Sequence, residues 1–229
     1  MASDLEPLVA AELAQPIEPR AAAMAAAIAA RYPGAARAVL FYGSCLRESN
    51  LDGLMLDFYL IVSDYRAAYG KSWLATANQL IPPNVFPFEA DGLAAKYAVL
   101  SEADFARLCG PEADNPSVWA RFAQPARLAW VADEAARQAV VMAVAQAAPT
   151  LLARTLPVAG ETVDPLDLWR AAFALTYSAE LRAERKTRSG SIVDADPDRY
   201  RTFSAPALAV AHGYDAARVA PEAARRGWG

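Results

Sequence analysis

The residues best suited to chemistry in this chain are the Gly43-Ser44 pair and an aspartate that follows it, Asp57. A Gly-Ser bend offers backbone N–H groups and a hydroxyl that can hold a phosphate. Asp57 interrupts the apolar run 55–62, and a carboxylate in such a run is costly to bury unless a positive charge lies against it. A phosphate holder beside a metal-binding carboxylate is what metal-dependent nucleotidyl transfer requires.

Strands and a turn must position these residues. Residues 38–42 are apolar and partly β-branched or aromatic, which predicts a strand that ends at the Gly-Ser bend, and residues 55–62 predict a second strand. Residues 85–89 and 94–100 predict a strand pair around the Asp91-Gly92 turn. A last short strand is predicted at 125–131.

Helical patterns surround the predicted strands. Prolines at 16 and 19 divide residues 5–31 into two helices, and residues 65–80 predict another. Ser101 is typical of a helix N-cap, with Asp104 three positions on. The rest predicts three longer helices, at 133–156, 164–184 and 196–211. We therefore expect an α+β fold: a mixed-sheet α/β domain with flanking helices over residues 1–132, then a helical domain with a short tail over residues 133–229.

The Gly-Ser and Asp57 stretches resemble the polymerase-β-type nucleotidyltransferase superfamily, whose signature is Gly-Ser followed by a strand with Asp-x-Asp. Tyr59 stands where the second Asp is usual. One branch, the mitochondrial-type phosphatidate cytidylyltransferase or translocator-maintenance family, also lacks that acid. Its core is similar to Tyr42-Gly43-Ser44-Cys45 and to residues 55–62 of this chain.

Further stretches are similar to the same family in the same order. They are Lys96–Ser101, Trp119 with Ala126-Arg127-Leu128, the segment 175–182, and Ser191-Ile192-Val193. Ala126 and Trp130 stand where the family has Gly and Lys. The resemblance spans roughly residues 38–205 and implies a nucleotidyltransferase-like sheet followed by an all-helical domain.

The resemblance implies a metal site built on Asp57. Asp52, in the loop before the second strand, supplies a second carboxylate in one interpretation and is a solvated loop acid in the simpler one. Glu89 lies on a neighbouring predicted strand, where this superfamily often places a third acid. An equally good interpretation is that Glu89 has no role beyond the strand itself. The cofactor that these carboxylates imply is Mg²⁺.

The resemblance also implies groups that hold phosphates. The nucleotide is expected on Tyr42-Gly43-Ser44, with Ser44, Asp57 and Lys96 as the catalytic set. Candidates for the substrate phosphate are three basic residues that are also interpretable as ordinary surface residues: Lys96, Arg127 and Arg182.

The reaction that the family implies joins CTP to phosphatidate, giving CDP-diacylglycerol and pyrophosphate. Two alternatives stay open from the residues alone. One keeps the chemistry and changes the acceptor to a soluble molecule or a protein hydroxyl. The other is a degenerate fold that binds a nucleotide or a partner without turnover.

Composition narrows the remaining classes. The net charge of −4 argues against general nucleic-acid binding, and two distant cysteines suggest neither a disulfide framework nor a zinc site. The first residues carry Asp4 and Glu6 rather than the basic start of a secretory signal. The longest apolar stretch, 139–153, is too short to span a bilayer. We expect a soluble cytoplasmic protein, with peripheral contact at the inner face of the membrane if the acceptor is a lipid.

Overall fold

The computed structural model describes residues 4–48, 50–70, 76, 83–159, 164–179 and 192–214, with the backbone alone for 177–179. Its internal contacts divide the chain into two compact units. The α/β unit comprises Ala10–Ala106 and Pro125–Met142, and the helical unit comprises Met1–Val9, Arg107–Gln124 and Ala143–Gly229. The units therefore alternate along the chain, whereas the sequence predicted a single boundary near residue 132.

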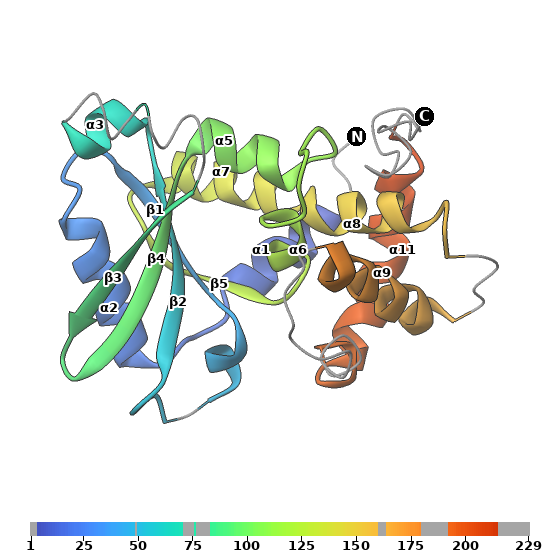
Figure 1. Cartoon of the computed structure of the whole chain (residues 1–229), viewed down its shortest axis with the longest axis horizontal. Coiled ribbons are helices and arrows are strands. Elements are labelled where there is room, and N and C mark those ends of the chain that lie inside the picture. The colour runs from blue at the N-terminus through green and yellow to red at the C-terminus, as the bar shows by residue number, and fades with distance from the viewer. Residues whose placement is uncertain are drawn as a thin grey trace. The chain divides into compact units, whose positions relative to one another are not determined.

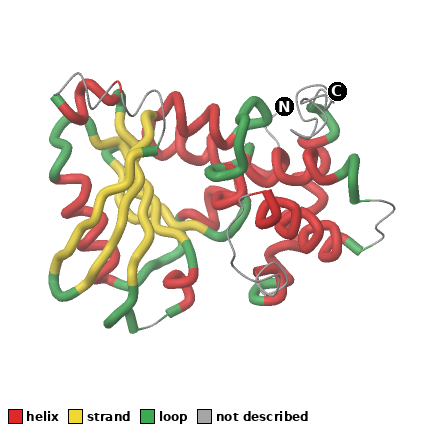
Figure 2. The backbone as a smooth tube through the Cα atoms, viewed as in Figure 1, coloured by secondary structure: helices red, strands yellow, loops and turns green. Residues whose placement is uncertain are grey.

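A five-stranded mixed sheet forms the centre of the α/β unit (Figures 1 and 2). Its strands are β1 (Ala36–Tyr42), β2 (Met55–Val62), β3 (Asn84–Ala90), β4 (Leu93–Ser101) and β5 (Ala126–Val131), in the order β3-β4-β2-β1-β5. Strands β2 and β4 are parallel, and the other neighbouring pairs are antiparallel. Together with the helical C-terminal region, this confirms the predicted α+β class and the mixed sheet.

Helix α2 (Pro19–Ala30) packs against one face of this sheet. Its Met24 and Ile28 belong to the same buried core as Phe41 of β1 and Phe58 of β2, whose rings stack 5.0 Å apart. Alternate residues of a strand point to opposite faces, so Phe41 and Phe58 face α2 and their chain neighbours face the other way. That second face carries Asp57.

The remaining helical signals of the α/β unit are partly borne out. Ser101 Oγ accepts a hydrogen bond from the Asp104 backbone N–H at 3.1 Å, which confirms the predicted N-cap of α5 (Glu102–Cys109). Asp64 caps the short α3 (Tyr65–Tyr69). Most of the rest of the predicted helix 65–80 lies outside the described residues.

The predicted helix 133–156 is in fact two helices, α7 (Glu134–Val144) and α8 (Ala147–Thr155). Pro149 is the cause. Proline has no N–H to donate to Ala145, and its ring clashes with that carbonyl in a continuous helix. Proline is tolerated only in the first turn of a helix, so α8 starts anew two residues before it.

Aromatic side chains build the core of the helical unit. The Trp169 ring of α9 (Pro165–Ala179) lies 5.1 Å from the Tyr200 ring of α11 (Pro197–Ala211). Buried Arg199 donates to the Ala123 carbonyl at 3.0 Å, just after α6 (Trp119–Phe122). Helices α1 (Leu5–Leu13), α5 and α7 have residues in both units.

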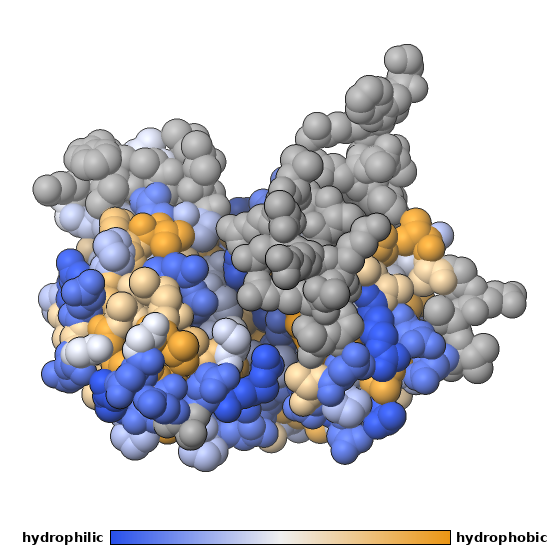
Figure 3. All heavy atoms as spheres, turned by 60° about the horizontal axis from the view of Figure 1, so that its bottom comes forward, coloured by the Kyte–Doolittle hydropathy of each residue, from blue (hydrophilic) through white to orange (hydrophobic). Residues whose placement is uncertain are grey.

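None of the described helices is long and apolar enough to cross a membrane. On the face shown in Figure 3, hydrophobic and hydrophilic side chains are interspersed wherever the surface is coloured.

Candidate functional site

A single row of residues crosses the sheet at Asp57. Lys96 is its neighbour on β4 and Tyr42 its neighbour on β1, and the row continues to Pro87 on β3 and Ala126 on β5. Paired residues share a face of a sheet, so Tyr42, Asp57 and Lys96 all point away from the core under α2. The register therefore brings together three residues that the sequence singled out.

The Asp57 carboxylate lies against Gly43. A Cβ placed on Gly43 would lie 3.4 Å from Asp57 Oδ2. Gly43 has φ 92° and ψ −167°, a conformation that is essentially restricted to glycine. The chain then forms the 3₁₀ turn Ser44–Arg47, which leaves the Ser44 side chain exposed beside this bend. The predicted juxtaposition of bend and carboxylate is thus present.

One oxygen of Asp57 lacks a hydrogen bond. Oδ1 is buried and has no hydrogen-bond partner within the part of the chain that the structure describes. Lys96 Nζ lies 3.3 Å from it, within ion-pair range. The Lys96 side chain is 54% exposed and that of Asp57 26%. An ion pair this open to water contributes only about 0–1 kcal/mol, so it is a weak match for a buried carboxylate oxygen.

Tyr59 occupies the position of the usual second acid, two residues from Asp57 on the same face of β2. Its side chain is 3% exposed, and its ring centroid lies 5.3 Å from that of Tyr42. The position is therefore filled by a buried aromatic pair, and the site is built on one carboxylate.

Cys45 follows the Gly43-Ser44 bend and is buried. Its Sγ is 3.5 Å from the Met55 carbonyl oxygen, which accepts the thiol hydrogen. Burial raises the pKa of this thiol, and the negative charge of Asp57 raises it further, whereas a hydrogen bond from Ser44 lowers it. The thiol is therefore protonated at neutral pH and adds no second negative charge beside Asp57. Cys45 belongs to the motif Tyr42–Cys45, and the residue pattern predicted no role for its thiol.

Asp52 is held elsewhere. Its Oδ1 accepts a hydrogen bond from Arg20 Nη1 at 2.7 Å, and its side chain is 66% exposed. Arg20 also donates to the Asp91 carbonyl oxygen at 3.1 Å, which links the start of α2 to the β3–β4 turn. The structure thus places Asp52 in an exposed ion pair with Arg20.

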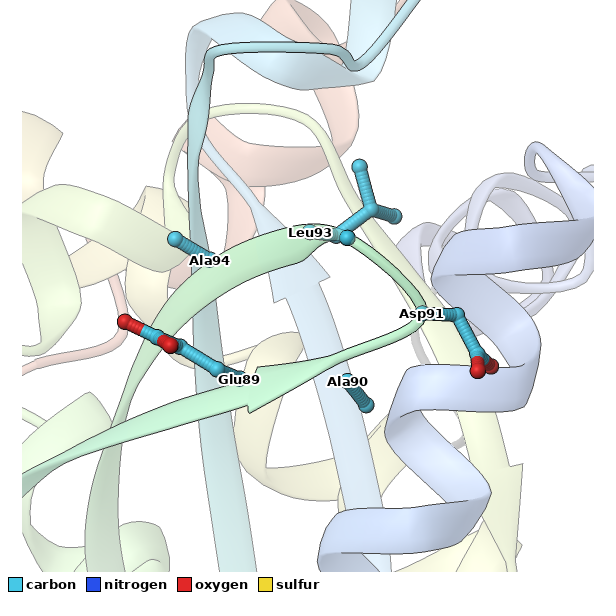
Figure 4. Close-up of a pocket in the computed structure, with 6 residues that line it drawn as sticks. Glu89, Ala90, Asp91, Leu93 and Ala94 are labelled. Carbon is cyan, nitrogen blue, oxygen red and sulfur yellow. The ribbon is translucent and has the colours of Figure 1, made fainter.

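Glu89 lies at a shallow, open hollow of about 450 Å³ at the β3–β4 turn, formed by residues 89–94. In Figure 4 its carboxylate extends on the same side as Ala94, whereas Asp91 points toward a helix on the other side. Glu89 pairs with Ala94, which in turn pairs with Met55. Strand spacings of about 4.8 Å and a rise of about 3.4 Å per residue place the Cα atoms of Glu89 and Asp57 roughly 12 Å apart, on the same face of the sheet.

The two other predicted phosphate ligands are not brought to Asp57 by the described structure. Arg127 pairs with Phe41, so the register directs it to the face covered by α2, and its Nη1 donates to the Ala126 carbonyl at 2.9 Å. Arg182 lies outside the described residues.

The single carboxylate of Asp57 suits a metal ion that keeps water molecules and substrate phosphates as its other ligands. Within the described residues, no group of three or more His, Cys, Asp or Glu side chains could enclose a metal. Mg²⁺ does not need such a group, because it keeps several waters and is commonly held by one or two carboxylates plus substrate phosphates. The unsatisfied Oδ1 of Asp57 is the kind of ligand that this mode requires.

Comparison with known proteins gives limited information. No family model and no curated protein matches the chain. Among solved structures, a nucleotidyltransferase-like protein from Exiguobacterium sibiricum is similar at 8% sequence identity, with a TM-score of 0.35. The match covers 80% of this chain and 65% of that one, just under two thirds of its length. A likeness this slight does not assign the chain to a family.

Proposed function

We propose that this protein is a Mg²⁺-dependent nucleotidyltransferase that transfers the cytidylyl group of CTP to phosphatidate. The observation that carries the proposal is the position of the Asp57 carboxylate, with Oδ2 against Gly43 and Oδ1 buried without a hydrogen bond. The choice of CTP and phosphatidate comes from the sequence resemblance to the phosphatidate cytidylyltransferase family.

Each residue of the site has a role in this proposal. Asp57 holds the Mg²⁺ that accompanies the nucleotide, and Tyr42 supports Asp57 from the neighbouring strand. Gly43 allows the bend that lies against that carboxylate, and Ser44 with the turn amides binds the β- and γ-phosphates. Lys96 neutralises substrate phosphate. When bound, Mg²⁺ supplies positive charge that offsets the charge of the phosphates.

A single carboxylate favours an acceptor that needs no general base. An ionised phosphate monoester is already nucleophilic: its oxygen forms a bond to the α-phosphorus of CTP while the bond from that phosphorus to the bridging oxygen breaks. Pyrophosphate leaves with the electron pair. A hydroxyl acceptor needs a base to take its proton, and Tyr59 stands where the second acid of the superfamily would be. The site therefore suits a phosphate acceptor better than a hydroxyl.

The proposal is tested by incubating the protein with Mg²⁺, each labelled nucleoside triphosphate in turn, and vesicles that contain phosphatidate. We expect pyrophosphate release that requires both CTP and the lipid, and a loss of at least about 100-fold in Asp57→Asn, as for removal of a group that stabilises transition-state charge. Vesicles of phosphatidylcholine alone are the control for lipid-dependent pyrophosphate release. Co-sedimentation of the protein with the vesicles measures its contact with the membrane. Release with a soluble phosphorylated acceptor instead of lipid would change the substrate and keep the reaction class.

A binding function without turnover is the second candidate. The buried Tyr42–Tyr59 pair favours this candidate, because Tyr59 stands where the superfamily has a second acid. Tight nucleotide binding with no pyrophosphate release under any condition supports this candidate over the first.

A further inference from the structure

The Lys96 ammonium occupies the place beside Asp57 Oδ1 that a metal ion would use. The two atoms are 3.3 Å apart, within ion-pair range, yet they do not form a hydrogen bond. Oδ1 thus lies beside a positive charge but accepts no hydrogen bond from the described residues.

The two partners differ in their freedom to move. Asp57 lies in a central strand of the sheet, between Tyr42 on one side and Lys96 on the other. Lys96 is on the neighbouring strand, but its side chain is 54% exposed, and its flexible four-carbon stem carries the charge. The ammonium can therefore leave Asp57, whereas the carboxylate stays in place.

Two of the other cations near this part of the sheet are engaged elsewhere. Arg20 binds Asp52 and the Asp91 carbonyl, and Arg127 is directed to the opposite face. Among the described residues, Lys96 is the cation that lies within ion-pair range of Asp57.

We infer that Lys96 is a resident counter-ion that keeps a divalent cation off Asp57 until a nucleotide arrives. This inference rests on the proposed function. A triphosphate offers the ammonium a more highly charged partner, so Lys96 turns to the phosphates and exposes Oδ1 to the metal that the nucleotide carries. Metal and nucleotide then bind interdependently, and each raises the affinity for the other by the same factor.

The experiment measures Mn²⁺ binding by the electron paramagnetic resonance of the free ion, without nucleotide and with a CTP analogue that has a methylene bridge between the α- and β-phosphates. Lys96→Met removes the charge and keeps the apolar stem. We expect this variant to bind Mn²⁺ alone about tenfold or more tightly than the wild type, because a like charge next to the ion is gone. The analogue should increase Mn²⁺ affinity much less in this variant than in the wild type.

Two further variants isolate the charge of Lys96. Arg137→Met removes an exposed positive charge that is paired with Glu134 in the same unit, and should leave Mn²⁺ affinity unchanged. Lys96→Arg keeps the charge and should retain the weak Mn²⁺ binding of the wild type. Thermal melting of every variant checks that it is folded.

The result that overturns the inference is equal Mn²⁺ affinity, without nucleotide, in wild type and Lys96→Met. If Asp57→Asn still abolishes analogue-dependent Mn²⁺ binding in that case, the proposed function stands and only the counter-ion role falls. If Asp57→Asn has no effect on Mn²⁺ binding under either condition, Asp57 is not a metal ligand, and both proposals fall together.

Discussion

Asp57 Oδ2 lies against the Gly43 bend, 3.4 Å from the place that a Cβ on Gly43 would take. A Cβ at that distance would make an ordinary van der Waals contact, so glycine is required at this bend for its backbone conformation. We predict that Gly43→Ala lowers the free energy of unfolding by about 1–3 kcal/mol, the usual range for strain in this region of φ and ψ. Urea denaturation measures the loss of stability.

A matched control separates general backbone strain from a role of the bend in nucleotide binding. Gly34 also has a positive φ, 75°, but a Cβ there would meet nothing within 4 Å. Gly34→Ala should also destabilise the protein while leaving nucleotide binding intact, whereas Gly43→Ala should weaken both. Equal nucleotide affinity in the two variants, measured by calorimetry, would contradict a role for the bend in binding.

The acids outside the central row should be dispensable for metal binding. Asp52 is held by Arg20, and Glu89 lies roughly 12 Å from Asp57 by the strand spacing. We predict that Asp52→Asn and Glu89→Gln change Mn²⁺ affinity in the presence of nucleotide by less than about threefold, since only carboxylates next to the ion act strongly on it. A loss comparable to that of Asp57→Asn in either variant would assign that residue to the metal site after all.

The thiol of Cys45 reports on the charge of Asp57. Burial and the neighbouring carboxylate raise its pKa, and only the thiolate reacts with iodoacetamide. Alkylation of Cys45, followed by peptide mass spectrometry in buffer with EDTA, should therefore accelerate only above the pH at which an ordinary cysteine does. Asp57→Asn removes a negative charge and should shift this profile to lower pH. An unchanged profile would show that the two groups do not interact.

Asp133 makes stability depend on pH at the start of α7. Its carboxylate accepts the Ala136 backbone N–H at 2.8 Å and pairs with Arg37 at 2.7 Å, and both contacts lower its pKa. A carboxyl group with a lowered pKa in the folded state stabilises the protein above its unfolded pKa, and this contribution is lost as the pH falls through the folded value. The melting temperature of the wild type should exceed that of Asp133→Asn at pH 7, and the gap should close toward pH 3. A gap that is constant with pH would exclude this linkage.

A buried hydrogen bond in the helical unit offers a test of its core. The Trp169 indole N–H donates to Ser204 Oγ at 2.9 Å, and Ser204 donates to the Tyr200 carbonyl. Ser204→Ala leaves the buried indole N–H without this acceptor and should cost about 1–3 kcal/mol of unfolding free energy. Thr202→Ala removes an equivalent bond to the Asp198 carbonyl on the exposed side of α11 and should cost less than about 0.5 kcal/mol. Similar losses in both variants would argue against the tertiary bond.

Much of the secondary structure follows from local sequence. The run 55–62 is apolar because β2 is a central strand, and the structure has a strand over the same residues. Pro16 and Pro19 separate α1 from α2, and Ser101 caps α5 as its pattern indicates. These features depend on residues within a few positions of one another. Where a signal was overlooked, it was also local: Pro149 divides the predicted helix 133–156.

The sequence by itself determined that a Gly-Ser bend precedes a strand with a lone carboxylate, because both features are local patterns of residue type. Only the tertiary structure decided what that carboxylate meets. Strands β2 and β4 are far apart in the chain, and their parallel register, which no local pattern fixes, puts Lys96 beside Asp57. The register of β5 against β1 turns Arg127 to the other face, because shifting a strand by one residue reverses the direction of every side chain. The register of β3 against β4 places Glu89 two residues along from the row of Asp57.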